Sequence, residues 1–347
     1  MPHGTLRELA TALLSRAPAT ALLAAVLLAG PAGAQPPRFD FPADCVVGRD
    51  CWYRAYVDLD PASTYRDHRC GVRSYENHRG TDVAPFSPGD PPFRVLAAAA
   101  GVVAGVRDGL DDSPLRDDSG DSSRRGVECG NGVRIDHGGG WATQYCHLRR
   151  GSVTVDRGAR VEAGDVLGVI GASGQADTPH LHFQVERDGT PVDPFTGAAA
   201  ARPVRCDATG SSAGALWRDP AAPGLSAYEP VVIYRAGVAT GRPDSARARY
   251  VGYPTEASVS AGALVGYVVL LGATGGTTVD TVISGPDGAR IFENRAEVPR
   301  DFARYFTFAG TPRPRSGWTP GVYEARFVVT AANGGYRTET TARIDLR

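Results

Sequence analysis

Histidines and an aspartate recur at three places in the chain, at spacings that could form one metal-dependent centre. In TPHLHFQVERDG, His180 and His182 are separated by one residue, and in ENHRGTDVA His78 precedes Asp82. A third segment, TQYCHL, contains His147. Imidazole nitrogens and carboxylate oxygens are zinc ligands, and a catalytic zinc typically takes three protein ligands and keeps one position for water. These residue types predict a metal site if the fold brings the segments together.

The HxH pair lies in a segment with the pattern of a strand. Because side chains alternate faces along a strand, His180 and His182 would share one face while Leu181 and Phe183 point into the core. A half-exposed strand that carries two histidines on its solvent face would show the same pattern. The pair alone therefore does not establish a site.

The HxxxD segment needs an irregular backbone. On a helix this spacing would align His78 with Asp82, but Gly80, Thr81 and Val83 disfavour a helix. We expect a loop or the start of a strand to bring the two side chains together.

In TQYCHL, strand alternation predicts Tyr145 and His147 on one face and Cys146 on the other. This placement leaves His147 available for chemistry and lets Cys146 reach a second cysteine such as Cys129. Tyr145 would either support a transition state or only pack.

Taken in the order HxxxD, YxHL and HxH, the segments resemble the lysostaphin/LytM-type zinc metallopeptidases, which act on bacterial cell-wall peptides. The similarity runs from about His78 to Phe195 and is carried by HRGTDVA, NGVRIDHGGGWATQYCHL, VEAGDVLGVIGASG and HLHF. It implies an all-β, mostly antiparallel fold with a lipoyl/biotinyl-like β-sheet groove. The family pattern also implies three zinc ligands, which are His78, Asp82 and His182. It implies a catalytic pair beside the metal, which is His147 and His180.

The implied ligand set is chemically suited to hydrolysis. Two neutral imidazoles and one carboxylate leave Zn²⁺ with net positive charge, which lowers the pKa of a bound water toward ~7 and polarises a carbonyl. One histidine outside the ligand set can accept a proton and another can donate to an oxyanion. His147 and His180 are the candidates; the base role slightly favours His147, and the division stays open. We expect His137, in DHGGG, to be structural.

The N-terminus has the pattern of a secretory signal. Arg7 and Arg16 precede an apolar run over 21–30, and Ala32-Gly33-Ala34 predicts cleavage after Ala34. The run is short for a membrane span, so an uncleaved anchor is the alternative and no stable membrane anchor is expected. We therefore expect a periplasmic or secreted protein.

Composition shifts divide the rest of the chain. After the signal peptide (1–34), the expected parts are an extended Cys-containing lead-in (35–77), the zinc metallopeptidase domain (78–200), a linker or docked tail (201–227) and an immunoglobulin-like β-sandwich (228–347). The sandwich prediction depends on turn signals, including Asn333-Gly334, and on six candidate strands: PVVIY, ALVGYVVLLGA, TTVDTVIS, ARYFTFAG, GVYEARFVVTA and YRTETTARIDL. This architecture implies no function by itself.

Six cysteines lie beyond the signal, and an even number in an exported chain fits disulfides. Of the 15 possible pairings, we expect Cys45–Cys51, Cys129–Cys146 and Cys70–Cys206. A thiolate metal site is the alternative, but no CxxC pair supports it. The segment from Asp108 to Gly126 contains six aspartates and is expected to be a solvated loop, with a calcium site or a substrate lid as alternatives.

The net charge of −1 gives no basic stripe for nucleic acid. The sequence thus predicts an exported endopeptidase with a Zn²⁺ cofactor, whose substrate is the peptides of peptidoglycan cross-links or stems. Two alternatives stay open. One is a non-catalytic wall-binding or hydrolase-activating scaffold protein, and the other is a secreted zinc protease that acts on a protein.

Overall fold

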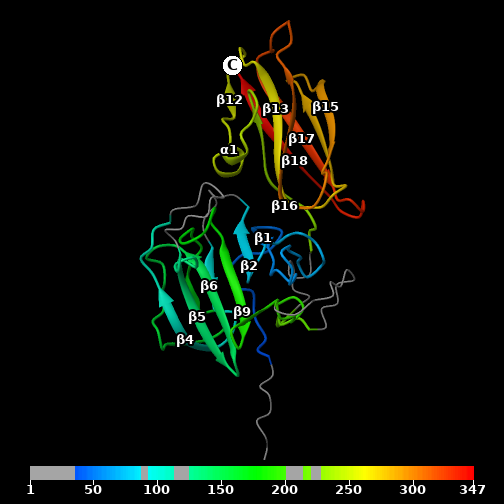
Figure 1. Ribbon diagram of the computed structural model, residues 1–347. Coiled ribbons are helices and arrows are strands. Elements are labelled where there is room, and N and C mark those ends of the chain that lie inside the picture. The colour runs from blue at the N-terminus through cyan, green and yellow to red at the C-terminus, as the bar shows by residue number, and fades with distance from the viewer. Residues whose placement is uncertain (1–35, 87–92, 113–124, 201–213, 220–227) are drawn as a thin grey trace, which may run out of the picture. The chain divides into compact units, whose positions relative to one another are not determined.

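Alternating and apolar runs form strands throughout the part of the chain that the structure describes. The computed structural model describes residues 36–86, 93–112, 125–200, 214–219 and 228–347 (Figure 1). Within these residues the one α-helix is α1 (Ser245–Tyr250), where the Asp244 side chain caps the first turn by accepting from the Arg247 amide. The predicted all-β, mostly antiparallel fold is confirmed.

One eight-stranded sheet carries the histidine-containing segments. Its spatial order is β1 (Cys51–Ala55), β2 (Thr81–Pro85), β9 (Leu181–Arg187), β6 (Trp141–Leu148), β5 (Asn131–Gly138), β4 (Gly101–Arg107) and β7 (Arg160–Val161), and β10 (Thr190–Val192) pairs with β9. A separate two-stranded sheet pairs β3 (Arg94–Leu96) with β8 (Val166–Val169). Because β2, β9 and β6 are neighbours, segments as far as 104 residues apart lie side by side (Figure 1).

The apolar alternates of β9 fix the direction of its histidines. Leu181, Phe183 and Val185 are at most 1% exposed and belong to the main core, whereas His182 lies on the opposite face. The predicted alternation along HLHFQV is therefore confirmed.

The lead-in contributes to the same core. Phe39, Tyr53 and Tyr56 are buried in it. Trp217, which follows the last strand of this sheet in the sequence, is buried in the same core. Phe39 forms a β-bridge with Trp217. The lead-in is thus a structural part of the sheet domain, because its aromatic side chains help to form the core.

Two further sheets form from residue 232 onward. One is β11 (Val232–Ala239), β13 (Ala263–Ala273) and β16 (Phe302–Pro312), and the other is β12 (Glu256–Ala257), β18 (Arg337–Leu346), β17 (Gly321–Thr330), β14 (Thr278–Ser284) and β15 (Arg290–Glu297). They share a core that includes Leu264, Val279, Phe327 and Ile344. The six predicted strands are all present, and the Asn333-Gly334 turn joins β17 to β18 with Gly334 at φ 68°. The immunoglobulin-like assignment stays a prediction.

Two of the three predicted disulfides are confirmed, Cys45–Cys51 and Cys129–Cys146. The third, Cys70–Cys206, is wrong, because Cys70 is a free thiol. Cys206 itself lies outside the described residues, as do the predicted signal peptide and residues 113–124 of the Asp-rich segment. The described start of that segment is anchored: Asp108 accepts a hydrogen bond from the Gly151 amide, and Asp112 accepts from the Arg150 and Ala172 amides.

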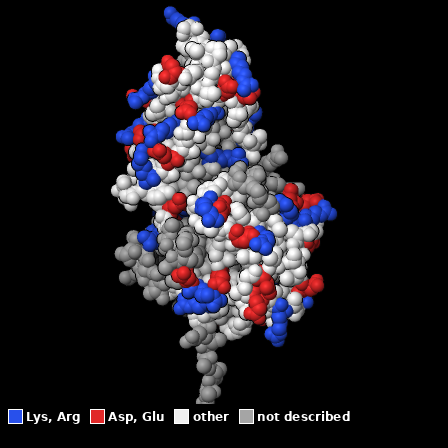
Figure 2. Space-filling model, turned by 180° about the vertical axis from the view of Figure 1, so that it is seen from behind, with Lys and Arg blue, Asp and Glu red and all other residues white. Residues whose placement is uncertain are grey.

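Charges of both signs are interspersed on the face shown in Figure 2. Among the described residues, no helix combines the length and apolar character that crossing a membrane requires.

Candidate active site and metal centre

Three side chains converge between β2 and β9. His78 lies just before β2, where Asn77 has a φ of 62°, while Asp82 and His182 are paired across the two strands. His78 Nε2 is 3.0 Å and His182 Nδ1 2.9 Å from Asp82 Oδ1, and the two nitrogens are 3.1 Å apart. The start of a strand thus brings the HxxxD residues together, as expected, and the register supplies the histidine from β9.

The tautomer of His78 is fixed by the backbone. Its Nδ1 lies 2.7 Å from the Tyr56 carbonyl oxygen, which can only accept, so Nδ1 carries the proton. In the neutral ring, Nε2 is then unprotonated, and its lone pair faces the Asp82 carboxylate. A lone pair and an anionic oxygen at 3.0 Å repel each other unless a proton or a cation lies between them.

The donor set fits a zinc ion. One ligand atom from each of His78, Asp82 and His182 can be chosen so that all three lie within 4.8 Å of one another. Asp82 is only 2% exposed. Burial alone raises the pKa of its carboxyl, but His78, His180 and His182 together lower that pKa well below its ordinary value. Two imidazoles and an ionised carboxylate are a common zinc ligand set.

Two more histidines face the same space, each held by a backbone carbonyl. His147 Nδ1 lies 2.8 Å from Ser173 O, and His180 Nδ1 lies 2.7 Å from Thr178 O. Both Nδ1 atoms therefore donate, and both Nε2 atoms are left as acceptors. The rings are 4.6 Å apart, and His180 Nε2 is 3.7 Å from Asp82 Oδ2. The two residues thus lie beside the trio with their proton-accepting nitrogens unprotonated.

Burial keeps both imidazoles neutral. It is the main cause of the low pKa of His147, to which the neighbouring imidazoles add. Burial also lowers the pKa of His180, and the Asp82 charge opposes this. Neutral imidazoles near pH 7 are suited to accept a proton.

The predicted placement of Tyr145 beside His147 is wrong. His147 has a φ of 64°, which breaks the strand alternation and turns its side chain to the face of Cys146. Tyr145 points into the core, where its Oη accepts from the Ala98 amide at 2.8 Å and the Thr143 hydroxyl at 3.0 Å. Of the two roles considered for Tyr145, the structure supports packing.

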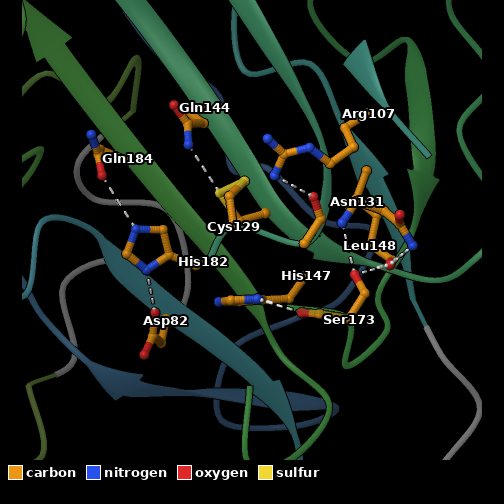
Figure 3. The surroundings of a disulfide bond; sticks show 12 residues. Asp82, Arg107, Cys129, Asn131, Gln144, His147, Leu148, Ser173, His182 and Gln184 are labelled. Atoms are coloured by element: carbon orange, nitrogen blue, oxygen red, sulfur yellow. Dashed lines mark hydrogen bonds and ion pairs between the residues drawn. A yellow bond between two sulfur atoms is a disulfide. The ribbon is translucent and has the colours of Figure 1, made fainter. Parts of the chain in front are cut away.

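The disulfide lies next to this irregularity. Figure 3 shows the bond from Cys129, with His182 directed to Asp82 on one side and His147 to Ser173 on the other. The His147 amide donates to the Cys129 carbonyl at 2.8 Å. The bond and this hydrogen bond together hold the end of β6.

Residues 76–194 match the sequence profile of Peptidase family M23. These residues are an M23 peptidase domain. The DD-carboxypeptidase/endopeptidase Mpg of Neisseria meningitidis serogroup B is 30% identical over 143 residues, which are 41% of this chain and 27% of Mpg. The peptidoglycan DD-endopeptidase ShyC of Vibrio cholerae is 34% identical over 120 residues, which are 34% of this chain and 22% of ShyC.

Among solved structures, a zinc-containing peptidase from Vibrio cholerae is similar with a TM-score of 0.30 and 25% identity, covering 48% of this chain and 40% of that one. The chain spans about a quarter of the length of the curated relatives named above. The recognition of a lysostaphin/LytM-type domain is confirmed for the region that carries the three motifs.

A cavity of about 700 Å³ joins the five predicted site residues in the M23 domain. Its lining also includes residues that the motifs did not single out, among them Arg54, Tyr75, Gln144, Gln184 and Glu186. The alternation of β9 was a signal for Gln184 and Glu186, which follow His182 on the same face. No motif pointed to Arg54 or to Tyr75, whose ring stacks on His78 at 4.2 Å.

The other described histidines lie away from this cavity. His137 has Nδ1 2.8 Å from the Ala100 carbonyl oxygen and Nε2 2.8 Å from the Thr143 hydroxyl, which fits the structural role expected of it. His68 is stacked on Phe195 with ring centroids 4.7 Å apart. Neither residue lines the candidate site.

Proposed function

We propose that this chain is an exported zinc metalloendopeptidase that hydrolyses peptide bonds in the cross-links or stems of peptidoglycan. One observation carries the proposal: a single cavity contains a His-Asp-His trio, of which His78 and Asp82 are buried, and two further histidines with unprotonated Nε2 atoms. The relatives of the M23 domain support the substrate class, since they include proteins named peptidoglycan DD-endopeptidases.

The proposed roles follow from which nitrogen of each ring is free. His78 Nε2, Asp82 Oδ1 and His182 Nδ1 would hold the zinc, which when bound supplies a Lewis acid that polarises a carbonyl and acidifies water. His147 and His180 would accept and return protons at Nε2, because both Nδ1 atoms are committed to carbonyls. An imidazole that has taken up a proton becomes a donor and can then stabilise negative charge on the substrate.

The cavity also has groups that can orient a peptide. Glu186 is buried and pairs with Arg134 at 2.7 Å, and Arg79 lies 3.9 Å from it. Gln184 lies between Glu186 and His182. Amides and charges of both signs in one cavity suit a substrate that itself carries ammonium, carboxylate and amide groups.

Digestion of purified sacculi tests this function. The purified protein, loaded with zinc, should release fragments with new peptide ends, detected by mass spectrometry. Chelator should abolish the release and added zinc should restore it. His180→Ala should release none, whereas the matched control His137→Gln, a histidine of the M23 domain that does not line the cavity, should match wild type. No release by zinc-loaded wild type, or equal release by His180→Ala, contradicts the proposal.

The same experiment distinguishes the two alternatives. A scaffold protein would release nothing alone but would increase release by a separate wall hydrolase, and His180→Ala would do so equally well. A protease for protein substrates would leave sacculi intact and cut an unfolded protein in a zinc-dependent manner.

A further inference from the structure

Arg54 reaches the candidate site from the lead-in, outside the residues that match family M23. In the pairing of β1 with β2, Tyr53 lies opposite Val83 and Ala55 lies opposite Asp82, so Arg54 is the extra residue of a β-bulge. A bulge redirects a side chain relative to regular alternation. Here the redirected side chain is a guanidinium that lines the cavity of the site.

The Arg54 guanidinium binds the turn that precedes His180. Nη1 donates to the Thr178 hydroxyl at 2.8 Å and lies 2.5 Å from Asp177 Oδ1, while Nη2 donates to Asp177 Oδ2 at 2.5 Å. The planar fork of an arginine is suited to such a two-pronged contact, which fixes orientation as well as charge. With side-chain exposures of 10% and 18%, Arg54 and Asp177 are largely shielded from water.

Asp177 depends on this pairing. Burial alone would raise the pKa of its carboxyl, but the charge and hydrogen bonds of Arg54 hold that pKa below its ordinary value. Arg304 Nη2 also lies near this carboxylate, 3.5 Å from Asp177 Oδ2. This distance is longer than that of a strong charge-assisted hydrogen bond. Arg54 is therefore the closer of these two guanidinium groups.

The turn held by Arg54 sets the His180 ring. The Thr178 carbonyl accepts the Nδ1 proton of His180, which leaves Nε2 unprotonated and facing the site. If the turn rotates, this carbonyl moves, and the ring loses both its tautomer and its aim. We infer that Arg54 is a positioning residue, which acts through Asp177 and Thr178 to hold His180 in the geometry that the reaction requires.

This inference rests on the proposed function only for its kinetic consequence. Arg54→Met removes the fork, and Arg54→Lys keeps a charge but lacks the planar two-pronged contact. Both variants should keep zinc, because the Arg54 hydrogen bonds go to Asp177 and Thr178 rather than to a proposed ligand, and the Asp82 charge is the weakest of the influences on Arg54. A displaced catalytic group costs up to about 100-fold in rate. We expect kcat to fall 10- to 100-fold in Arg54→Met and less in Arg54→Lys, with KM nearly unchanged.

Histidine-ring NMR gives a readout that does not depend on turnover. With ¹⁵N-labelled histidine and assignment by His180→Ala, wild type should show the Nδ1-protonated tautomer of His180. Arg54→Met should show a mixture of tautomers or an exchange-broadened signal. Arg49→Met is the matched control, since Arg49 is an exposed lead-in arginine paired with its neighbour Asp50. It should leave both the ring signal and kcat unchanged.

A double-mutant comparison completes the test. Asp177→Asn should have little further effect on kcat in the Arg54→Met background, because both substitutions break the same link. The inference is wrong if a folded Arg54→Met protein keeps the wild-type His180 ring signal, or if it loses zinc in parallel with activity. If wild type cuts no wall peptide, the proposed function fails, while the NMR comparison still decides whether Arg54 positions His180.

Discussion

Asp82 and His182 lie directly opposite each other in the pairing of β2 with β9, with Oδ1 and Nδ1 2.9 Å apart. The candidate metal centre is therefore a product of strand register. A slip of one residue would turn His182 to the core face and Phe183 to the site, because side chains alternate along a strand. The buried Leu181, Phe183 and Val185 oppose such a slip.

The proposed ligand trio (His78, Asp82 and His182) and the proposed catalytic pair (His147 and His180) should separate experimentally. Loss of a residue that only supports a metal ligand lowers metal affinity by roughly 10- to 100-fold. Asp82→Ala or His182→Ala should lower zinc affinity by more than this, since each substitution removes a proposed ligand atom. His180→Ala should keep zinc while kcat falls by about 10²–10⁴-fold, the range for loss of a proton-transfer group. Zinc content by metal analysis and kcat on a wall peptide check both statements. A His180→Ala protein that cannot hold zinc would contradict the division.

Gly80 is a sensitive position beside the candidate metal centre. A Cβ there would lie 2.7 Å from both Cε1 and Nε2 of the His182 ring and 2.7 Å from the Phe183 carbonyl oxygen. Gly80→Ala should displace His182 and lower zinc affinity, by about 10–100-fold if the ring shifts without being lost. Titration with a competing chelator measures the change. Gly105→Ala is the control, because its nearest neighbour would be 4.0 Å away, and equal affinities in the two variants would refute the prediction.

Tyr145→Phe should affect stability and leave kcat unchanged. The substitution leaves the Ala98 amide without its acceptor in the core, and an unsatisfied buried group costs about 1–3 kcal/mol. Urea unfolding gives the free-energy difference, and a wall-peptide assay gives kcat. A large loss of kcat with unchanged stability would instead restore a catalytic role for the hydroxyl.

Half-buried His68 should make the protein less stable in mild acid. Burial lowers its pKa, so the unfolded chain binds the proton more readily, and the free energy of unfolding rises with pH across this window. Stability should therefore fall as pH drops below about 6.5, the ordinary histidine pKa. Between pH 7.5 and 5, the urea midpoint should fall more in wild type than in His68→Gln. Equal falls would show that His68 does not contribute.

Much of the fold could be predicted because apolar periodicity is a local property. The segment ALVGYVVLLGA forms β13 with the predicted bounds, and HLHFQV alternates as expected. β15 (Arg290–Glu297) was missed because it is an edge strand with mostly exposed polar side chains, so its sequence shows no apolar face.

The site could be predicted in part. Residue types and order pointed to the four histidines and one aspartate that share the cavity. Tyr145 was misplaced because strand alternation assumes a regular backbone, and the positive φ of His147 is an exception that local sequence does not announce. Arg54 could not be found because its role depends on a bulge and on contact with residues more than 120 positions away.

The β-bridge between Phe39 and Trp217 bears on how this protein can be cut and recombined. The family profile begins at residue 76 and ends at residue 194, yet the core of the same sheet domain is closed by side chains from both flanks. A segment transplanted at the profile's limits would carry all five site residues but would leave behind Arg54 and the aromatic residues that seal the core. The transferable unit of this protein is therefore wider than the segment that matches the family profile, and chimeras with other proteins should be joined before Phe39 and after Trp217.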